Sequence, residues 1–108
     1  ADYGIESVTT AATYEIADLY YGLSQDLINS ERPAELGEAE LEQYEILLEE
    51  QAFPFEEQAI DILQSNTLRA RDGVYDEWVR KSFARLAELM PARYAKSERS
   101  ENIVAALD

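Results

Sequence analysis

Carboxylates are the most abundant groups in this 108-residue sequence that could do chemistry. One set recurs at helical spacing and would share a single helix face: Glu38, Glu42, Glu45 and Glu49. Four-helix proteins that bind two metal ions use glutamates in this way, but they pair them with a histidine three residues further on. The sequence has no histidine, so we expect no metal site here.

Other catalytic chemistry has little support in the residue types. Without His and Cys, the chain lacks thiol nucleophiles and the usual general base near neutral pH. The four glycines form no phosphate-binding loop. We therefore predict a chain that is not an enzyme and that has no cofactor. The alternative is a carboxylate-rich enzyme, in which two acids act as general acid and general base, or a helical bundle that binds a divalent metal.

Aromatic side chains are the more informative set, because Tyr and Trp are enriched at protein interfaces. The candidate interaction surface is formed by Tyr14, Tyr21, Phe53, Trp78 and Tyr94. Two interpretations of Tyr14 and Tyr21 stay open. They either pack against the next helix with their hydroxyls in water, or they form an interface.

Charge restricts the partners. The net charge of −14 would repel nucleic-acid phosphates and anionic membrane surfaces, so we predict protein partners and no nucleic acid. No apolar run approaches the ~20 residues that span a bilayer, so we predict no direct membrane insertion. Residues 1–68 carry 16 acids and one base, whereas residues 69–100 carry eight bases and five acids. This asymmetry fits helix faces that attract each other within the fold, or a surface for a basic partner or a second copy.

The elements that must position these residues are helices. Over residues 5–29, one apolar stripe has spacings of 4, 4, 3, 4 and 4, which predicts an α-helix: Val8, Ala12, Ile16, Leu19, Leu23 and Leu27. Glu31, Arg32 and Pro33 end it, because the residue before a proline is pushed out of the α conformation. Gly37 ends the loop that follows.

A second helix begins near Glu38. Its apolar stripe keeps one helical phase through Pro54 and is predicted to face the core: Leu41, Tyr44, Leu48, Ala52, Phe55, Ala59 and Leu63. A proline inside a helix removes a hydrogen bond and clashes with the preceding turn. The unbroken stripe favours one long helix kinked at Pro54 over two helices that meet near residues 51–53. Gly73 is a natural residue just past the helix end.

A third helix is predicted from about Tyr75 to Met90, with Asp76 in its first turn and Pro91 at its end. Strand signals are nearly absent. We therefore predict an all-α fold, a small antiparallel bundle of three to four helices. Residues 1–96 would form one helical domain, and residues 97–108 a tail that is first polar and then apolar.

The third helix carries the first sign of a family. Val79, Phe83, Leu86 and Pro91 have the spacing of the second helix of a tetratricopeptide repeat (TPR), although Val79 and Leu86 stand where the repeat has alanine. Longer segments resemble the C-terminal region of large TPR proteins of Gram-negative bacteria: residues 3–21, 30–33, 47–57, 75–78 and 86–96.

This resemblance implies a TPR-like fold and a non-catalytic scaffold domain for protein–protein contact, the C-terminal unit of a repeat protein. It implies the bacterial cell envelope or periplasm as the location, with the cytoplasm left open. The last unit of a repeat array caps the stack. A purely structural cap is therefore a third possibility, and a fragment cut from the array would form a weak homodimer through its uncovered face.

Overall fold

The computed structural model describes residues 2–91, and these residues are helical with short connections. Helix α1 spans Asp2–Ile28, α2 spans Glu38–Arg69, and a short 3-10 turn, η1, spans Ala70–Asp72. A third helix covers residues 77–91, up to the end of the described range. No strand occurs between residues 2 and 91, so the all-helical prediction is confirmed for this part of the chain.

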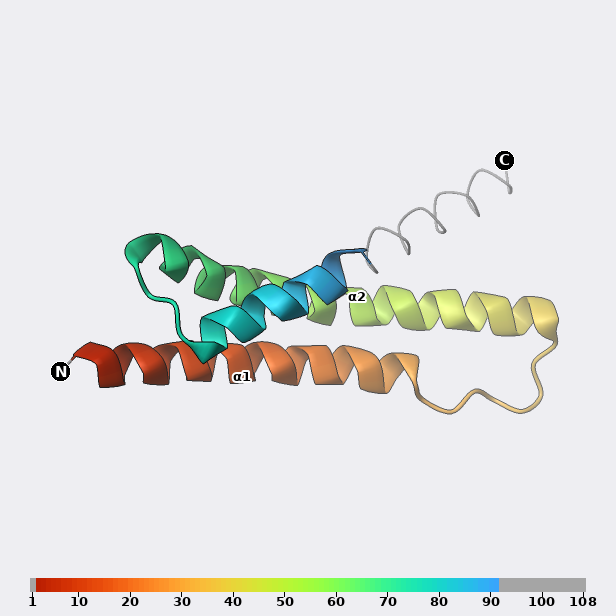
Figure 1. The fold of residues 1–108 in the computed structure, drawn as a ribbon. Coiled ribbons are helices and arrows are strands. Elements are labelled where there is room, and N and C mark those ends of the chain that lie inside the picture. The colour runs from red at the N-terminus through yellow and green to blue at the C-terminus, as the bar shows by residue number, and fades with distance from the viewer. Residues whose placement is uncertain (1, 92–108) are drawn as a thin grey trace.

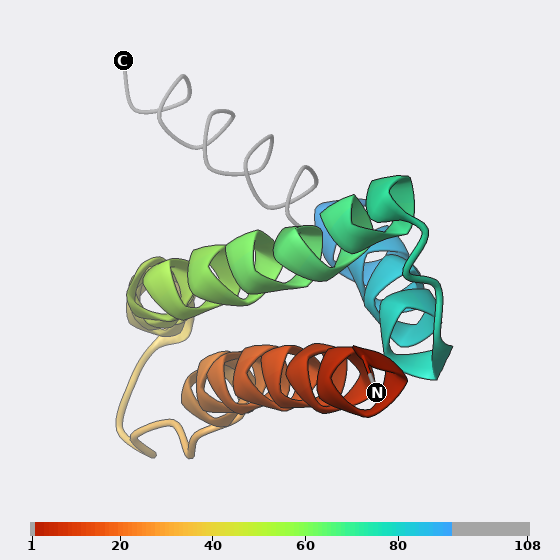
Figure 2. The same cartoon turned by 90° about the vertical axis from the view of Figure 1, so that its left-hand side faces the viewer.

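The two long helices lie side by side and run in opposite directions, joined by residues 29–37 (Figure 1). Helix α2 extends past the C-terminal end of α1. The third helix packs against the middle of α1 and the C-terminal half of α2 (Figure 2). The three helices therefore meet in the middle of the molecule, and the N-terminal part of α2 extends beyond the other two helices.

Helix α2 passes through Pro54 without interruption. Its 32 residues form one helix, so the prediction of a single long helix is confirmed, whereas the kink at Pro54 stays a prediction. The first turn contains Glu38 and Glu40 and the last turn contains Arg69, which places charges favourably at both ends of the helix dipole.

Gly73 lies just past the end of α2 and η1, as predicted from the sequence. This glycine adopts a left-handed conformation with φ of 84°, which residues with a Cβ rarely adopt. Its N–H donates to the Ala70 carbonyl at 3.2 Å, and the Val74 N–H donates to the Arg69 carbonyl at 3.1 Å. These bonds satisfy carbonyl groups that the helix leaves open, and they turn the chain toward the third helix.

The predicted stripe of α2 faces the core. Leu48, Ala52, Ala59 and Leu63 are buried, and the remaining members of the stripe are half-buried. A cluster at the centre of the molecule joins the three helices: Ala17, Ile60, Leu63 and Leu89. The helical phase of α2 was therefore a sound guide to its buried side.

Helix α1 buries a different side from its apolar stripe. Its buried residues recur every seven positions and have small side chains: Thr10, Ala17 and Ser24. Tyr14 and Tyr21 lie half-buried between them and pack against the core cluster. Small side chains let two helix backbones approach closely, so the aliphatic stripe on the other side of α1 is left outside.

The third helix begins at residue 77, two positions later than the predicted start at Tyr75. The reason is Asp76, whose Oδ1 accepts the N–H groups of Trp78 and Val79 at 3.0 and 2.9 Å. Asp76 is therefore the N-cap of this helix and not a residue of its first turn. Tyr94 and the predicted tail, residues 97–108, lie outside the described residues.

Candidate functional site

The exposed aliphatic stripe of α1 is the main candidate site, and we call it the outer face. It comprises Ile5, Val8, Ala12, Ile16, Leu19 and Leu23, spaced 3, 4, 4, 3 and 4 along the helix. Apart from Ala12, which is also exposed, these side chains are between 47% and 70% exposed. Single exposed leucines are normal, but a row along one helix face is typical of an interaction site.

The outer face points away from the rest of the described molecule. At about 100° per residue, its centre lies about 140° around α1 from the buried Thr10, Ala17 and Ser24. Figure 2 shows α2 and the third helix on the other sides of α1, and no described helix covers the remaining side. Helix α1 therefore has two apolar contact sides, and one of them has no partner within residues 2–91.

The two edges of the outer face differ in charge. On the edge toward the third helix lie the exposed carboxylates of Glu15 and Asp26. On the edge toward α2, Tyr20 stacks on Phe55 with ring centroids 6.5 Å apart. Thr9 also lies on that edge, and its hydroxyl donates to the Ile5 carbonyl at 2.9 Å. One edge is thus anionic, and the other carries no charged residue between positions 9 and 20.

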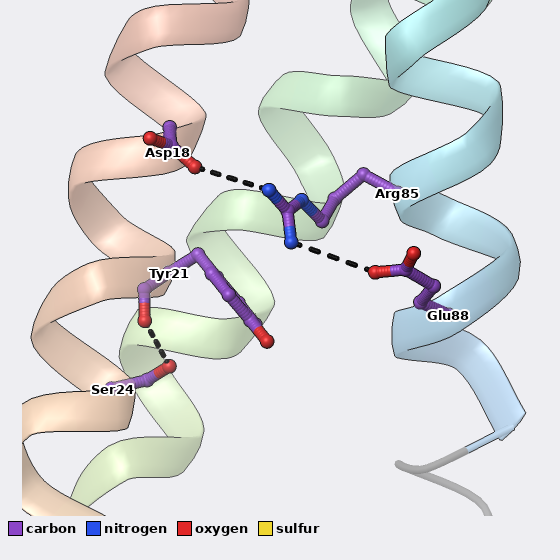
Figure 3. A network of polar contacts seen from close by, with 5 residues as sticks. All are labelled: Asp18, Tyr21, Ser24, Arg85 and Glu88. Atoms are coloured by element: carbon purple, nitrogen blue, oxygen red, sulfur yellow. Dashed lines mark hydrogen bonds and ion pairs between the residues drawn. The ribbon is translucent and has the colours of Figure 1, made fainter.

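Arg85 closes the seam between α1 and the third helix (Figure 3). Its guanidinium lies 3.4 Å from Asp18 Oδ1 and 3.5 Å from Glu88 Oε2, and its Cζ lies 4.7 Å from the centroid of the Tyr21 ring. Burial lowers the pKa of Arg85, but a hydrogen bond with Tyr14 and the charges of Asp18 and Glu88 outweigh burial and raise it. The Arg85 guanidinium therefore makes its contacts with residues of the fold itself.

A buried polar junction joins the three helices near the N-terminal end of α1. Asn66 Nδ2 donates to the Thr10 carbonyl and to Ser82 Oγ, both at 3.0 Å. Arg69 donates to Asn66 Oδ1 and to Thr13 Oγ1, the latter at 3.2 Å. Among residues 2–91, no buried side-chain nitrogen or oxygen lacks a partner. The junction is therefore a structural clamp whose groups are already satisfied.

Asp76 belongs to the same junction. The Thr10 hydroxyl donates to Asp76 Oδ2 at 2.5 Å. Burial raises the pKa of Asp76, but this bond and the N–H groups of Val79 and Trp78 outweigh burial and lower the pKa below its ordinary value of 3.8. A carboxylate held ionised in this way is suited to capping a helix and not to proton transfer near neutral pH.

The structure brings together three of the five predicted interaction residues. The rings of Tyr14 and Trp78 lie 5.8 Å apart at 45°, and Tyr21 lies on the same side of α1 beneath Arg85. Phe53 lies apart from them on α2 and is 40% exposed. Tyr94 is outside the described residues. Tyr14, Tyr21 and Trp78 therefore belong mainly to the seam between helices.

Sequence reasoning did not single out Asn66 or the exposed state of the outer face. A signal for Asn66 was present: it continues the stripe of Ala59 and Leu63 at spacings of 4 and 3, so a polar residue stands at a core position. Buried amides need hydrogen-bond partners, which would have pointed to a clamp. No comparable signal distinguished the two sides of α1.

The glutamate face of α2 does not gather into a site. Glu45 lies 3.9 Å from the Arg32 guanidinium, and Glu38 and Glu42 are exposed. Within residues 2–91, no three acids come together where they could hold a metal ion. In the same part of the chain, no helix is both long and apolar enough to cross a membrane.

Comparison of the chain with protein-family models, with curated proteins and with solved structures finds no match.

Proposed function

We propose that this chain is a non-catalytic protein–protein interaction domain that offers the outer face of α1 to another protein. The observation that carries this proposal is the row of exposed aliphatic side chains on a helix whose opposite side is already packed. In water, covering such a face is favourable because it removes apolar surface from solvent.

We further propose that the domain is a TPR-like unit at the C-terminal end of a repeat scaffold of the bacterial cell envelope. The segments that resemble large TPR proteins support this, together with two long helices that run in opposite directions and a third helix against them. In a repeat array each unit buries its face against a neighbour. On this view the outer face of α1 would receive a helix from an upstream unit or from a separate partner protein.

The interaction role can be tested with a displayed library of helical peptides that share an apolar face and vary in sequence. We expect the immobilised chain to enrich amphipathic helices from a displayed peptide library, and we expect Leu19→Gln to abolish this enrichment. The matched control is Leu47→Gln, since Leu47 is 47% exposed on α2 and lies outside the outer face. Circular dichroism would establish that both variants keep the helical fold.

Two outcomes would overturn the proposed function. The first is a library from which no peptide is enriched by the wild-type chain. The second is enrichment that Leu19→Gln and Leu47→Gln change equally, because the outer face would then have no special role.

A further inference from the structure

We infer that the partner of the outer face is an amphipathic helix that carries lysine or arginine along one edge of its apolar side. This inference rests on the proposed function and adds the chemistry of the partner. It is carried by the charges that border the outer face and not by the apolar side chains alone.

Helix α1 has no cation to offer a partner. Its 27 residues contain five acids and neither lysine nor arginine. Asp18 is engaged by Arg85 from the third helix, whereas Glu15 and Asp26 lie exposed further around the helix, beside the outer face. A partner with acids at this edge would bring like charges together at an interface, which costs affinity.

The spacing of the two carboxylates sets the spacing of the partner's cations. Glu15 and Asp26 are eleven positions apart, which corresponds to about 16 Å along the helix at 1.5 Å per residue. A partner helix aligned with α1 would match them with two cations eleven positions apart. Between residues 9 and 20, the opposite edge of the outer face, with Thr9 and Tyr20, carries no charged residue. Cations along one edge of the partner therefore favour one orientation of the partner on α1.

A second copy of this chain is a poor occupant of the same face. An isologous dimer would place two outer faces together, each bordered by Glu15 and Asp26, and each chain carries a net charge of −14. Salt therefore separates the two cases. A basic-edged helix would bind more weakly as salt rises, whereas a homodimer of acidic chains would tighten.

The experiment uses three synthetic helical peptides that share one apolar face and differ only in two edge positions eleven residues apart. These positions carry Lys, Gln or Glu. Fluorescence anisotropy with the full chain would give Kd for each peptide at low and moderate salt. We expect the Lys peptide to bind about fivefold more tightly than the Gln peptide, the gain of two exposed ion pairs, and the Glu peptide to bind most weakly. This preference should shrink as salt rises.

The double variant Glu15→Gln/Asp26→Asn should remove the preference for Lys and leave binding of the Gln peptide unchanged. Asp61→Asn is the matched control, because Asp61 is an exposed acid of α2 away from the outer face. Equal binding of the three peptides, or a preference that survives the double variant, would overturn the inference while leaving the interaction role intact. Absence of binding by all three, combined with a dimer in sedimentation that tightens with salt, would identify a second copy as the occupant.

Discussion

The two sides of α1 reverse the usual relation between hydrophobicity and burial. The inner side is built from Thr10, Ala17 and Ser24, which are at most 1% exposed, whereas Val8 and Leu19 on the outer face are 69% and 70% exposed. Hydroxyl groups can be buried here because they bond locally: Ser24 Oγ donates to the Tyr21 carbonyl at 2.6 Å. The inner side of α1 can therefore face the core without leaving a buried hydroxyl group unpaired.

The two sides of α1 also differ in what they contribute to the stability of the chain. The inner side contributes to the stability of this fold, since it packs against Leu63 and Leu89. The outer face contributes little to the stability of the isolated chain, because water still covers most of it. Substitutions on the two sides should consequently differ in their effect on stability.

The largest effect is expected from Leu63→Ala. Leu63 is 1% exposed in the central cluster, so the substitution removes buried surface and leaves a cavity, with a loss of roughly 2–5 kcal/mol in the free energy of unfolding. Leu19→Ala is the partner variant on the outer face and should change stability by less than about 0.5 kcal/mol. Urea denaturation measures both. Equal losses would mean that the outer face is covered in solution.

A smaller effect is expected when the inner side is enlarged. Ala17→Leu should cost about 1–3 kcal/mol, because Ala17 is 1% exposed and packs against Ile60, Leu63 and Leu89, which a larger side chain would have to displace. Ala12→Leu makes the same change on the outer face and should be nearly neutral. Thermal melts followed by circular dichroism compare the two. If Ala17→Leu were tolerated as well as Ala12→Leu, the close approach of the helices would be refuted.

The smallest effect concerns the cap. Asp76→Ala should cost about 0.5–2 kcal/mol near neutral pH through the lost N-cap, and Asp72→Ala, an exposed acid in η1, should cost less. Because the pKa of Asp76 is lowered in the folded chain, its contribution is present above the ordinary value of 3.8 and is lost as pH falls through the lower folded value. The gap in stability between wild type and Asp76→Ala should therefore close on acidification. A gap that stays constant with pH would show that the carboxylate charge has no part in the cap.

Much of the fold followed from sequence patterns with a local cause. The breaks at Pro33 and Gly73 and the phase of α2 are such patterns, because each depends on residues within a few turns of one helix. The buried side of α2 was predictable for the same reason. Its stripe has seven apolar members in one helical phase, more than any other side of α2, so the local pattern was sufficient to identify the buried side.

The rest depended on contacts between segments far apart in the sequence. Helix α1 has two sides that can pack, and its own periodicity favoured the more aliphatic side. The side of α1 that is buried depends on contacts with distant residues. Trp78 packs against Tyr14, and Asn66 donates a hydrogen bond to the Thr10 carbonyl. The full role of Asp76 could not be predicted from local sequence either, because its hydrogen bond with Thr10 joins residues 66 positions apart.

The hydrogen bonds of Asn66 bear on the order in which the chain can assemble. During synthesis α1 and α2 leave the ribosome first, and Asn66 then has the Thr10 carbonyl but not yet Ser82 as a partner. The final docking step therefore completes the hydrogen bonds of all three helices together, which favours one cooperative transition over the stepwise loss of a single helix.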